Sequence, residues 1–273
     1  EFMTITGHTT VLGVISDPVA HVRAPQVFNP LFEAGGIDAV LVPVHVTPQG
    51  LPSAIIGLKE TLNFRGLAVT IPHKVEIAKL CDALGDNGRR VGAVNAVRFD
   101  TAPDGTRRMV GDMFDGMGYV AGMAAGGFDF RGKRVLQIGA GGAGMAIAFA
   151  VADAGASHIT IANRTPAKAE DLAGRIAAEF PELEARGAGA DTDPAGYDVI
   201  LNATSLGLKP DDPLPFDLGR ASPGCAISEI IMIPERTKLL DAAEARGHPI
   251  HFGRPMLEHQ AKLMMDFFGF GVA

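Results

Sequence analysis

The chain has 273 residues, of which 47% are apolar and 20% are charged, and its formal net charge is −7. This mildly acidic composition excludes a disordered acidic tail and a nucleic-acid binder that relies on a basic surface. Two distant cysteines, Cys81 and Cys225, predict neither a disulfide framework nor a metal site. Glycines interrupt the longest uncharged stretch, residues 135–152, so we expect no membrane span. The cysteine usage fits a reducing cytoplasm, and no export signal is expected after Met3.

Short apolar runs alternate with helical patterns along the chain, which is typical of an α/β protein with largely parallel sheets. In the first half we expect strands at residues 11–15, 39–45, 66–70 and 93–99, and helices after the first three. Asp104-Gly105 predicts a hairpin that joins the fourth strand to residues 107–110, because Asp-Gly supplies the positive φ of such turns. One edge of this first sheet should therefore be antiparallel.

The second half begins with a Gly- and Ala-rich helix at Asp115. Strands are expected at residues 133–138, 158–162, 198–202 and 225–231. Thr165 and Pro166 suit the N-cap and first position of a helix that includes residues 169–176. The chain ends in an amphipathic helix at residues 255–268.

A G-x-G-x-x-G pattern, Gly139, Gly141 and Gly144, directly follows one expected strand and precedes a helix. Glycines in this context let backbone N–H groups approach a pyrophosphate at the helix N-terminus. An ordinary glycine turn is the alternative. The surrounding βαβ pattern favours a dinucleotide site.

The residues after the next strand select the cofactor. NAD sites usually have Asp or Glu about 20 residues after the glycines, where it bonds the ribose hydroxyls. This chain has Asn163 and Arg164 there, followed by Thr165 and Lys168. Arg164 can grip a 2′-phosphate that a carboxylate would repel, so NADP is predicted over NAD. The alternative is that Arg164 is a solvated loop charge.

Six further segments place polar residues where loops should surround a cofactor cleft. They are Asp17-Pro-Val-Ala-His21, Thr70-Ile-Pro-His-Lys74, Gly92-Ala-Val-Asn95, Gly111-Asp-Met-Phe-Asp115, Asn202-Ala-Thr-Ser205 and Pro255-Met-Leu-Glu-His-Gln260. In this order around the glycine motif, they resemble the shikimate dehydrogenase family from about residue 13 to residue 269.

The resemblance implies a two-domain α/β enzyme of aromatic amino acid biosynthesis. Its first domain, residues 3–112 completed by residues 250–273, would have a mixed sheet and bind the substrate. A Rossmann domain, residues 113–249, would bind NADP. The implied partners are a small cyclic hydroxy acid or polyol and at most a second copy of the chain, as a monomer or homodimer, with no nucleic acid or membrane.

The implied reaction is reversible hydride transfer between NADP and a ring secondary alcohol. Hydride leaves a carbinol carbon only as the hydroxyl proton is removed, so a base must touch that oxygen. Lys74 and Asp115 match a Lys and an Asp that share this work in the family, with a surface ion pair as the alternative reading. Thr70, Asn95 and Gln260 match positions that bond the substrate hydroxyls, although a helical Gln is often solvent-facing.

The resemblance also implies a set of cofactor-binding residues. They are Gly139, Ala140, Gly141, Gly142, Ala143, Asn163, Arg164, Thr165, Lys168, Asn202, Ala203, Thr204, Ser205, Ile230 and Gly253.

The chain departs from the family pattern around the substrate carboxylate. The family's His-Ser-x-Ser-Pro reads His21-Val22-Arg23-Ala24-Pro25 here, so both hydroxyls that hold the carboxylate are missing. Asn-Thr before the catalytic Asp is replaced by Met113-Phe114, and a Tyr that helps hold the carboxylate falls at Met232. We expect a pocket remodelled around Val22, Ala24 and Met232 for another ring substituent, with at most weak activity on shikimate.

Two other functions are compatible with parts of this pattern. An NADP-binding sensor or regulatory paralogue with little catalysis would have no need of Lys74, Asp115, Asn95 and Gln260. A methylene-folate dehydrogenase has a related two-domain plan, but it fits the 163–168 and 202–205 segments less well.

Overall fold

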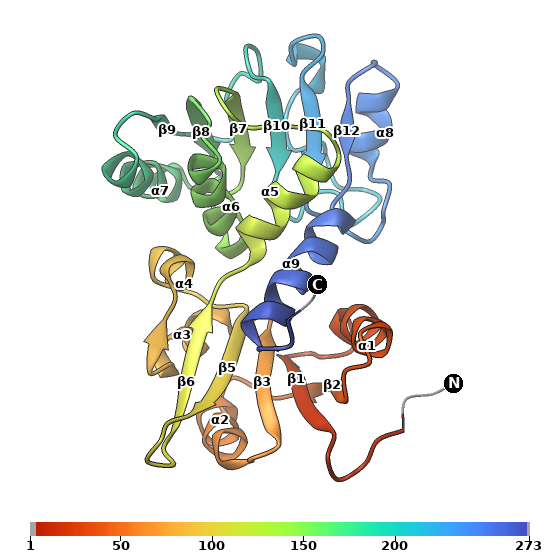
Figure 1. Ribbon diagram of the computed structural model, residues 1–273. Helices are drawn as coiled ribbons and strands as arrows, with labels where there is room; N and C mark the ends of the chain where they lie inside the picture. Colours follow the sequence, from red (N-terminus) through yellow and green to blue (C-terminus); the bar gives the residue numbers. More distant parts are fainter. Residues whose placement is uncertain (1–3, 272–273) are drawn as a thin grey trace. The chain divides into compact units, whose positions relative to one another are not determined.

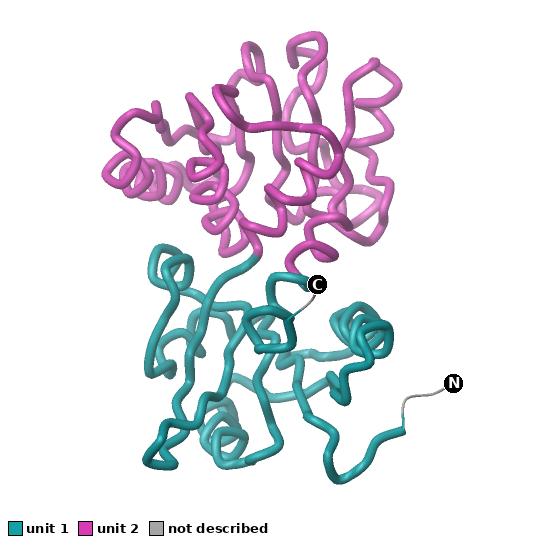
Figure 2. Tube along the Cα trace, in the orientation of Figure 1, with its two compact units in different colours: residues 1–114, 261–273 teal, residues 115–260 magenta. Residues whose placement is uncertain are grey.

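The computed structural model describes residues 4–271; residue 3 and residues 272–273, the outer ends of the predicted first domain, lie outside the described part. The chain forms two compact units, coloured separately in Figure 2: unit 1 comprises residues 1–114 and 261–273, and unit 2 comprises residues 115–260. The predicted boundaries therefore need correction. Phe114 belongs to the hydrophobic core of unit 1, and residues 250–260 belong to unit 2.

Unit 1 contains a six-stranded sheet (Figure 1). Its elements are β1 (Thr10–Ser16), α1 (Ala24–Ala34), β2 (Ala39–His45), α2 (Leu51–Glu60), β3 (Phe64–Val69), α3 (Lys74–Leu80), β4 (Ala83–Leu84), α4 (Asp86–Val91), β5 (Ala96–Thr101) and β6 (Arg107–Asp112). The strand order is β2-β1-β3-β5-β6-β4, and only β5 runs antiparallel to its neighbours. The mixed sheet is confirmed, but the antiparallel strand is interior rather than at an edge, because β6 returns parallel to β3 and β4 pairs beyond it.

Both faces of this sheet are covered by apolar side chains. One core cluster joins β1 and β2 to Phe28 and Phe32 of α1, and to the end of the last helix, α9 (Arg254–Phe267), together with Phe268 directly after it. The other packs α2 and α3 against β3 and β5. The C-terminal segment therefore completes the core of unit 1 although the rest of α9 belongs to unit 2.

Unit 2 is built on a parallel sheet. Its elements are α5 (Asp115–Ala125), β7 (Arg134–Ile138), α6 (Gly142–Asp153), β8 (His158–Ala162), α7 (Pro166–Glu179), β9 (Glu184–Ala188), β10 (Val199–Asn202), the short 3-10 helix Leu218–Arg220, β11 (Ala226–Glu229), α8 (Lys238–Glu244) and β12 (Ile250–His251). The strand order is β12-β11-β10-β7-β8-β9. Successive strands are therefore added on one side of β7 up to β9 and on its other side from β10 onward, so the strand order switches between β7 and β10. Ligands of doubly wound folds bind outside the carboxyl ends of the strands at such a reversal, so the predicted Rossmann unit is confirmed.

Small residues let α5 pack closely within unit 2. A Cβ at Gly116 would clash with the Ala146 carbonyl of α6. A Cβ at Gly118 would lie 2.6 Å from both the Met256 carbonyl oxygen and the Gln260 Cβ of α9. The Gly- and Ala-rich composition of α5 thus reflects close helix packing. Within residues 4–271, no helix is both long and apolar enough to span a membrane.

Candidate active site

The glycine-rich turn joins β7 to α6 in unit 2. Gly139 has φ 112°, a conformation that favours glycine, and a Cβ there would lie 2.8 Å from the Ala203 carbonyl oxygen. A Cβ at Gly144 would lie 2.6 Å from the Gly139 carbonyl oxygen. No atom lies within 4 Å of a Cβ built at Gly141 or Gly142. The outer glycines therefore allow close packing, and the middle ones leave the start of α6 open to an anionic ligand.

Gln137 is a site residue that the sequence analysis missed. It is fully buried, and its Nε2 donates hydrogen bonds to the carbonyl oxygens of Gly139 (2.9 Å) and Gly144 (2.8 Å). These bonds tie the first and third glycines of the motif together. The available signal was a single polar side chain inside the apolar strand 134–138.

The segment after β8 presents the residues predicted to hold the 2′-phosphate. Asn163 links this segment to the glycine turn, because its Oδ1 accepts a hydrogen bond from Ala140 N (3.3 Å). Its Nδ2 donates to the Thr165 carbonyl within the segment (3.0 Å). Arg164, Thr165 and Lys168 are exposed. Thr165 occupies the expected N-cap of α7, but its hydroxyl makes no capping bond. The segment can therefore offer a guanidinium and a hydroxyl to a phosphate group.

The 202–206 turn follows β10 and is organised by Asn202, which is fully buried. Asn202 Oδ1 accepts hydrogen bonds from Thr204 N (3.1 Å) and Thr204 Oγ1 (2.7 Å). Its Nδ2 donates to the Leu206 carbonyl (2.9 Å) and to Glu229 Oε1 (3.2 Å). Because these bonds use the whole amide, Asn202 shapes the turn from within. Ser205 is exposed at its tip.

Glu229, the second site residue that the sequence analysis missed, ends β11 and has no exposed surface. Burial raises the pKa of its carboxyl above the ordinary value, and the neighbouring Asn202 amide and Thr237 hydroxyl offset this effect only in part. The available signal was a lone acid within the apolar run 225–231.

Gly253, which is predicted to bind the cofactor, makes a close backbone approach within unit 2. A Cβ on Gly253 would lie 2.6 Å from the Ile230 carbonyl carbon and would clash with the Ile231 carbonyl oxygen. Only glycine fits here, so the chain entering α9 lies directly against the segment that leaves β11.

Three predicted site residues, the catalytic Lys74 and the substrate-binding Thr70 and Asn95, come together at one end of the unit 1 sheet. Thr70 directly follows β3, whose last residue, Val69, donates a backbone hydrogen bond to the Asn95 carbonyl (2.7 Å). Val94 N donates to the carbonyl of Lys74 (3.0 Å), the first residue of α3. Asn95 is 4% exposed, and its Oδ1 accepts from the backbone N–H of the residue preceding Asp115 (2.8 Å).

Four of the residues that depart from the family pattern belong to unit 1, and one of them, Met113, is 1% exposed. Val22 and Ala24 pack against the core cluster that contains Phe114, and the Phe114 ring centroid lies 5.2 Å from that of Phe267. Arg23 is exposed at the N-cap of α1. Met232, the remaining altered position, belongs to unit 2 and is 39% exposed.

Asp115 and Gln260 belong to neighbouring helices of unit 2. Asp115 opens α5 and is 4% exposed, and Gln260 on α9 is 9% exposed. The close approach at Gly118 brings these two helices together one turn after Asp115. Lys74 belongs to unit 1, so the Lys74–Asp115 pair stays a prediction.

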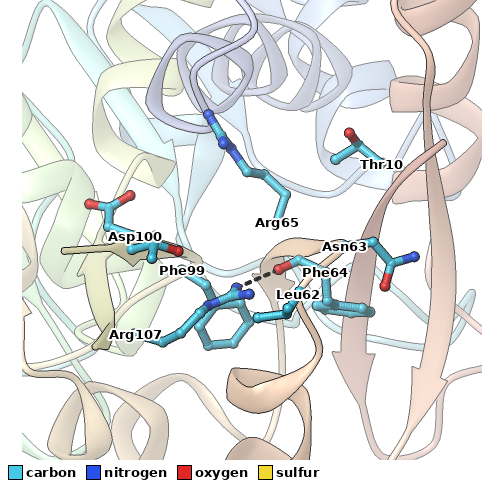
Figure 3. Close-up of a pocket in the computed structure, with 9 residues that line it drawn as sticks. Thr10, Leu62, Asn63, Phe64, Arg65, Phe99, Asp100 and Arg107 are labelled. Atoms are coloured by element: carbon cyan, nitrogen blue, oxygen red, sulfur yellow. Dashed lines mark hydrogen bonds between the residues drawn. The ribbon is translucent and has the colours of Figure 1, made fainter. Parts of the chain in front are cut away.

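A polar pocket of about 460 Å³ lies at the opposite end of β3, and its lining contains none of the predicted site residues (Figure 3). Arg107 fills part of it: Nη2 donates to the Phe64 carbonyl (2.8 Å), and the guanidinium carbon lies 5.5 Å from the Phe99 ring centroid. We interpret Arg107 as a structural residue. In the described part of the chain, no group of three or more His, Cys, Asp and Glu residues could hold a metal ion.

Comparisons with known proteins agree with this arrangement. Residues 14–97 match the shikimate dehydrogenase substrate binding domain, and residues 121–206 match the shikimate/quinate 5-dehydrogenase family. A shikimate dehydrogenase (NADP(+)) of Acidiphilium cryptum is 39% identical over 259 residues, covering 95% of this chain and 90% of that protein.

Two solved structures share the fold over nearly the whole chain. A shikimate dehydrogenase in complex with NADP+ has a TM-score of 0.90 at 32% identity, covering 97% of this chain and 92% of the other. The ligand-free 5-ketofructose reductase of Gluconobacter sp. strain CHM43 has a TM-score of 0.88 at 30% identity, covering 98% and 95%. With identity and fold extending over both units, the chain belongs to the shikimate dehydrogenase family.

Proposed function

We propose that this protein is an NADP-dependent oxidoreductase that transfers hydride reversibly between NADP and a secondary alcohol of a shikimate-like ring polyol. The observation that carries the substrate part of this proposal is the apolar cluster joined by Val22, Ala24 and Phe114. The family resemblance gives these positions polar side chains, two of which hold a carboxylate. The preferred substrate therefore lacks a carboxylate at that place.

The choice of NADP is supported by the exposed Arg164 and Thr165 at the start of α7 and by the absence of an acid between Asn163 and Lys168. The relative from Acidiphilium cryptum carries NADP(+) in its name. When bound, NADP accepts the hydride in oxidation, and NADPH delivers it in reduction. The open Gly141 and Gly142 positions leave room for the pyrophosphate beside the first turn of α6.

The chain's own residues supply the proton chemistry. In this proposal Lys74 removes the hydroxyl proton from the carbinol during oxidation and returns it during reduction, and Asp115 orients the ammonium group. Thr70, Asn95 and Gln260 bond the ring hydroxyls and fix which carbon faces the cofactor. Retention of these polar residues beside altered carboxylate positions favours a changed enzyme over a sensor.

An apolar lining also disfavours a charged substituent directly. A substrate carboxylate placed against Val22 and Ala24 would lose its bound water without gaining hydrogen-bond donors from the protein. Burying an unpaired ion in this way costs roughly several kcal/mol of binding free energy. The 5-ketofructose reductase among the similar structures is named for an uncharged sugar substrate. Reduction of a neutral polyhydroxy ketone is accordingly the second candidate function.

Steady-state assays with NADP(H) test both candidates. The panel comprises shikimate and quinate as acids, inositols as neutral ring polyols, and 5-ketofructose as a neutral ketone. We expect a neutral compound to have the highest kcat/KM and shikimate to be poor. Efficient turnover of shikimate would contradict the altered specificity, and NADPH binding without turnover of any compound would support the sensor.

A further inference from the structure

Glu229 is a buried acid that has few hydrogen-bond partners and no cation beside it among the described residues. Its carboxyl is fully buried, Oε1 accepts a hydrogen bond from Asn202 Nδ2 (3.2 Å), and the buried Thr237 hydroxyl lies beside the carboxyl. Within residues 4–271, Oε2 has no hydrogen-bond partner, and none of the ion pairs found there includes this carboxylate. Acids are rarely buried without a cation, so a specific demand must keep an acceptor at this place.

The position of Glu229 in the sheet indicates what that demand is. A doubly wound unit consists of two mononucleotide-binding halves that meet at the reversal of strand order, here between β7 and β10. Arg164 follows β8, in the half predicted to bind the adenosine 2′-phosphate. Asn202 and Glu229 are paired residues at the ends of β10 and β11, in the other half. That half is left for the nicotinamide nucleotide.

We propose that Glu229 is a positioning residue for the nicotinamide half of NADP, acting through Asn202 on the 202–206 turn. This inference rests on the proposed function, since it presupposes that NADP is the cofactor. Glu229 touches neither cofactor nor substrate in this proposal. Its task is to keep one orientation of the Asn202 amide.

The hydrogen bonds of Asn202 explain why an acceptor is needed. Its Oδ1 receives both Thr204 bonds, and its Nδ2 must therefore face Leu206 and Glu229. Without an acceptor at residue 229, one Nδ2 hydrogen would be left unpaired in a fully buried place. The amide would then be held in this orientation by three hydrogen bonds instead of four, so Asn202 would hold Thr204 and the turn less firmly. A neutral amide at residue 229 would still offer an acceptor oxygen.

The experiment compares two ligands on three variants. 2′,5′-ADP carries only the adenosine half of the cofactor, whereas NADP carries both halves. Calorimetry measures both affinities for the native protein, Glu229→Met, Glu229→Gln and the matched control Glu235→Met, which removes an exposed acid nearby. For Glu229→Met we expect NADP binding to weaken about tenfold, equivalent to one lost buried hydrogen bond, with 2′,5′-ADP binding unchanged within about twofold.

The variants also separate positioning from general stability. Glu229→Gln should keep native affinity for both ligands and native kcat, and Glu235→Met should do the same. Equal losses of both ligands in Glu229→Met, or native NADP affinity in that variant, would overturn the inference. If Glu229→Met does not fold, Thr204→Val supplies the test, since it removes the hydroxyl that Asn202 Oδ1 holds. Failure of Thr204→Val to weaken NADP selectively would also overturn the inference.

The native protein tests the proposed function separately. If it binds neither ligand, NADP is not the cofactor and both proposals fall. If it binds both and only the variants behave unexpectedly, the proposed function stands and the role of Glu229 falls.

Discussion

The cofactor loops of unit 2 and the altered segment of unit 1 are built in opposite ways. In unit 2, buried amide side chains fasten the loops: Gln137 bonds the glycine turn, and Asn202 bonds the turn after β10. In unit 1, Val22 and Ala24 instead pack on an apolar core. In unit 2, the side-chain amides hold the backbone of the cofactor loops in one conformation, as binding of a single cofactor requires. Substrate preference can change through side chains alone, while the backbone hydrogen bonds at Lys74 and Asn95 stay intact.

The largest expected effect concerns Lys74, the proposed base, which both candidate functions require. Lys74→Ala should lower kcat on the best substrate by about two to four decades, the usual contribution of a positioned acid or base, with NADP binding nearly intact. Stopped-flow and steady-state kinetics measure both quantities. Lys79→Ala, at the exposed end of the same helix, is the control and should retain native kcat. Survival of turnover in Lys74→Ala would place the base elsewhere.

Restoring hydroxyls in unit 1 tests whether the side chains at residues 22 and 24 lower activity on shikimate, as proposed. A charge-assisted hydrogen bond to a carboxylate contributes about 1.5 to 3 kcal/mol. The double variant Val22→Ser, Ala24→Ser should therefore raise kcat/KM for shikimate by about one to three decades. This is less than the full gain of two such bonds because Met113, Phe114 and Met232 remain. Val27→Ser, in the same cluster, should give no gain. An unchanged kcat/KM in the double variant would show that another group holds the carboxylate.

The cofactor side of the comparison is tested at the start of α7. Arg164→Ala removes the guanidinium predicted to bind the 2′-phosphate, so kcat/KM with NADP should fall about 10- to 100-fold. The value with NAD should change by less than about twofold, because NAD has no such phosphate. Arg186→Ala, which removes an exposed cation from neighbouring β9, serves as the control. Equal kcat/KM for both cofactors in the native protein would refute the predicted preference.

The smallest effect is on stability, and its pH dependence reports on buried Glu229. Burial raises the folded-state pKa of this carboxyl, so its protonation stabilises the fold, and this contribution is fully present below the unfolded pKa. The contribution is lost as pH rises through the folded-state pKa. Glu229→Gln cannot ionise, so its Tm should exceed the native Tm at high pH and approach it near pH 4, an approximate lower limit set by the unfolded carboxyl. A Tm difference independent of pH would exclude ionisation of Glu229 as the cause.

Strands with strong apolar patterns were predictable, and the weak ones were not. Residues 39–45 and 158–162 form β2 and β8 as expected. β9, with the sequence Glu-Ala-Arg-Gly-Ala, lacks an apolar run, and β12 has only two residues. Both are edge strands of the sheet, held by pairing to β8 and β11. Local propensity carries too little information to identify such strands.

The sequence by itself determined the features that depend on neighbouring residues: the glycine turn between strand and helix, the cation after β8, and the family pattern with its altered positions. Only the tertiary structure placed Val22 and Phe114 in one apolar cluster, and only strand pairing put Asn202 beside Glu229. These residues are far apart in the chain, and sheet register decides which side chains meet. A buried polar group reveals its role only when its partner is known, because its free energy depends on the hydrogen bonds it makes there.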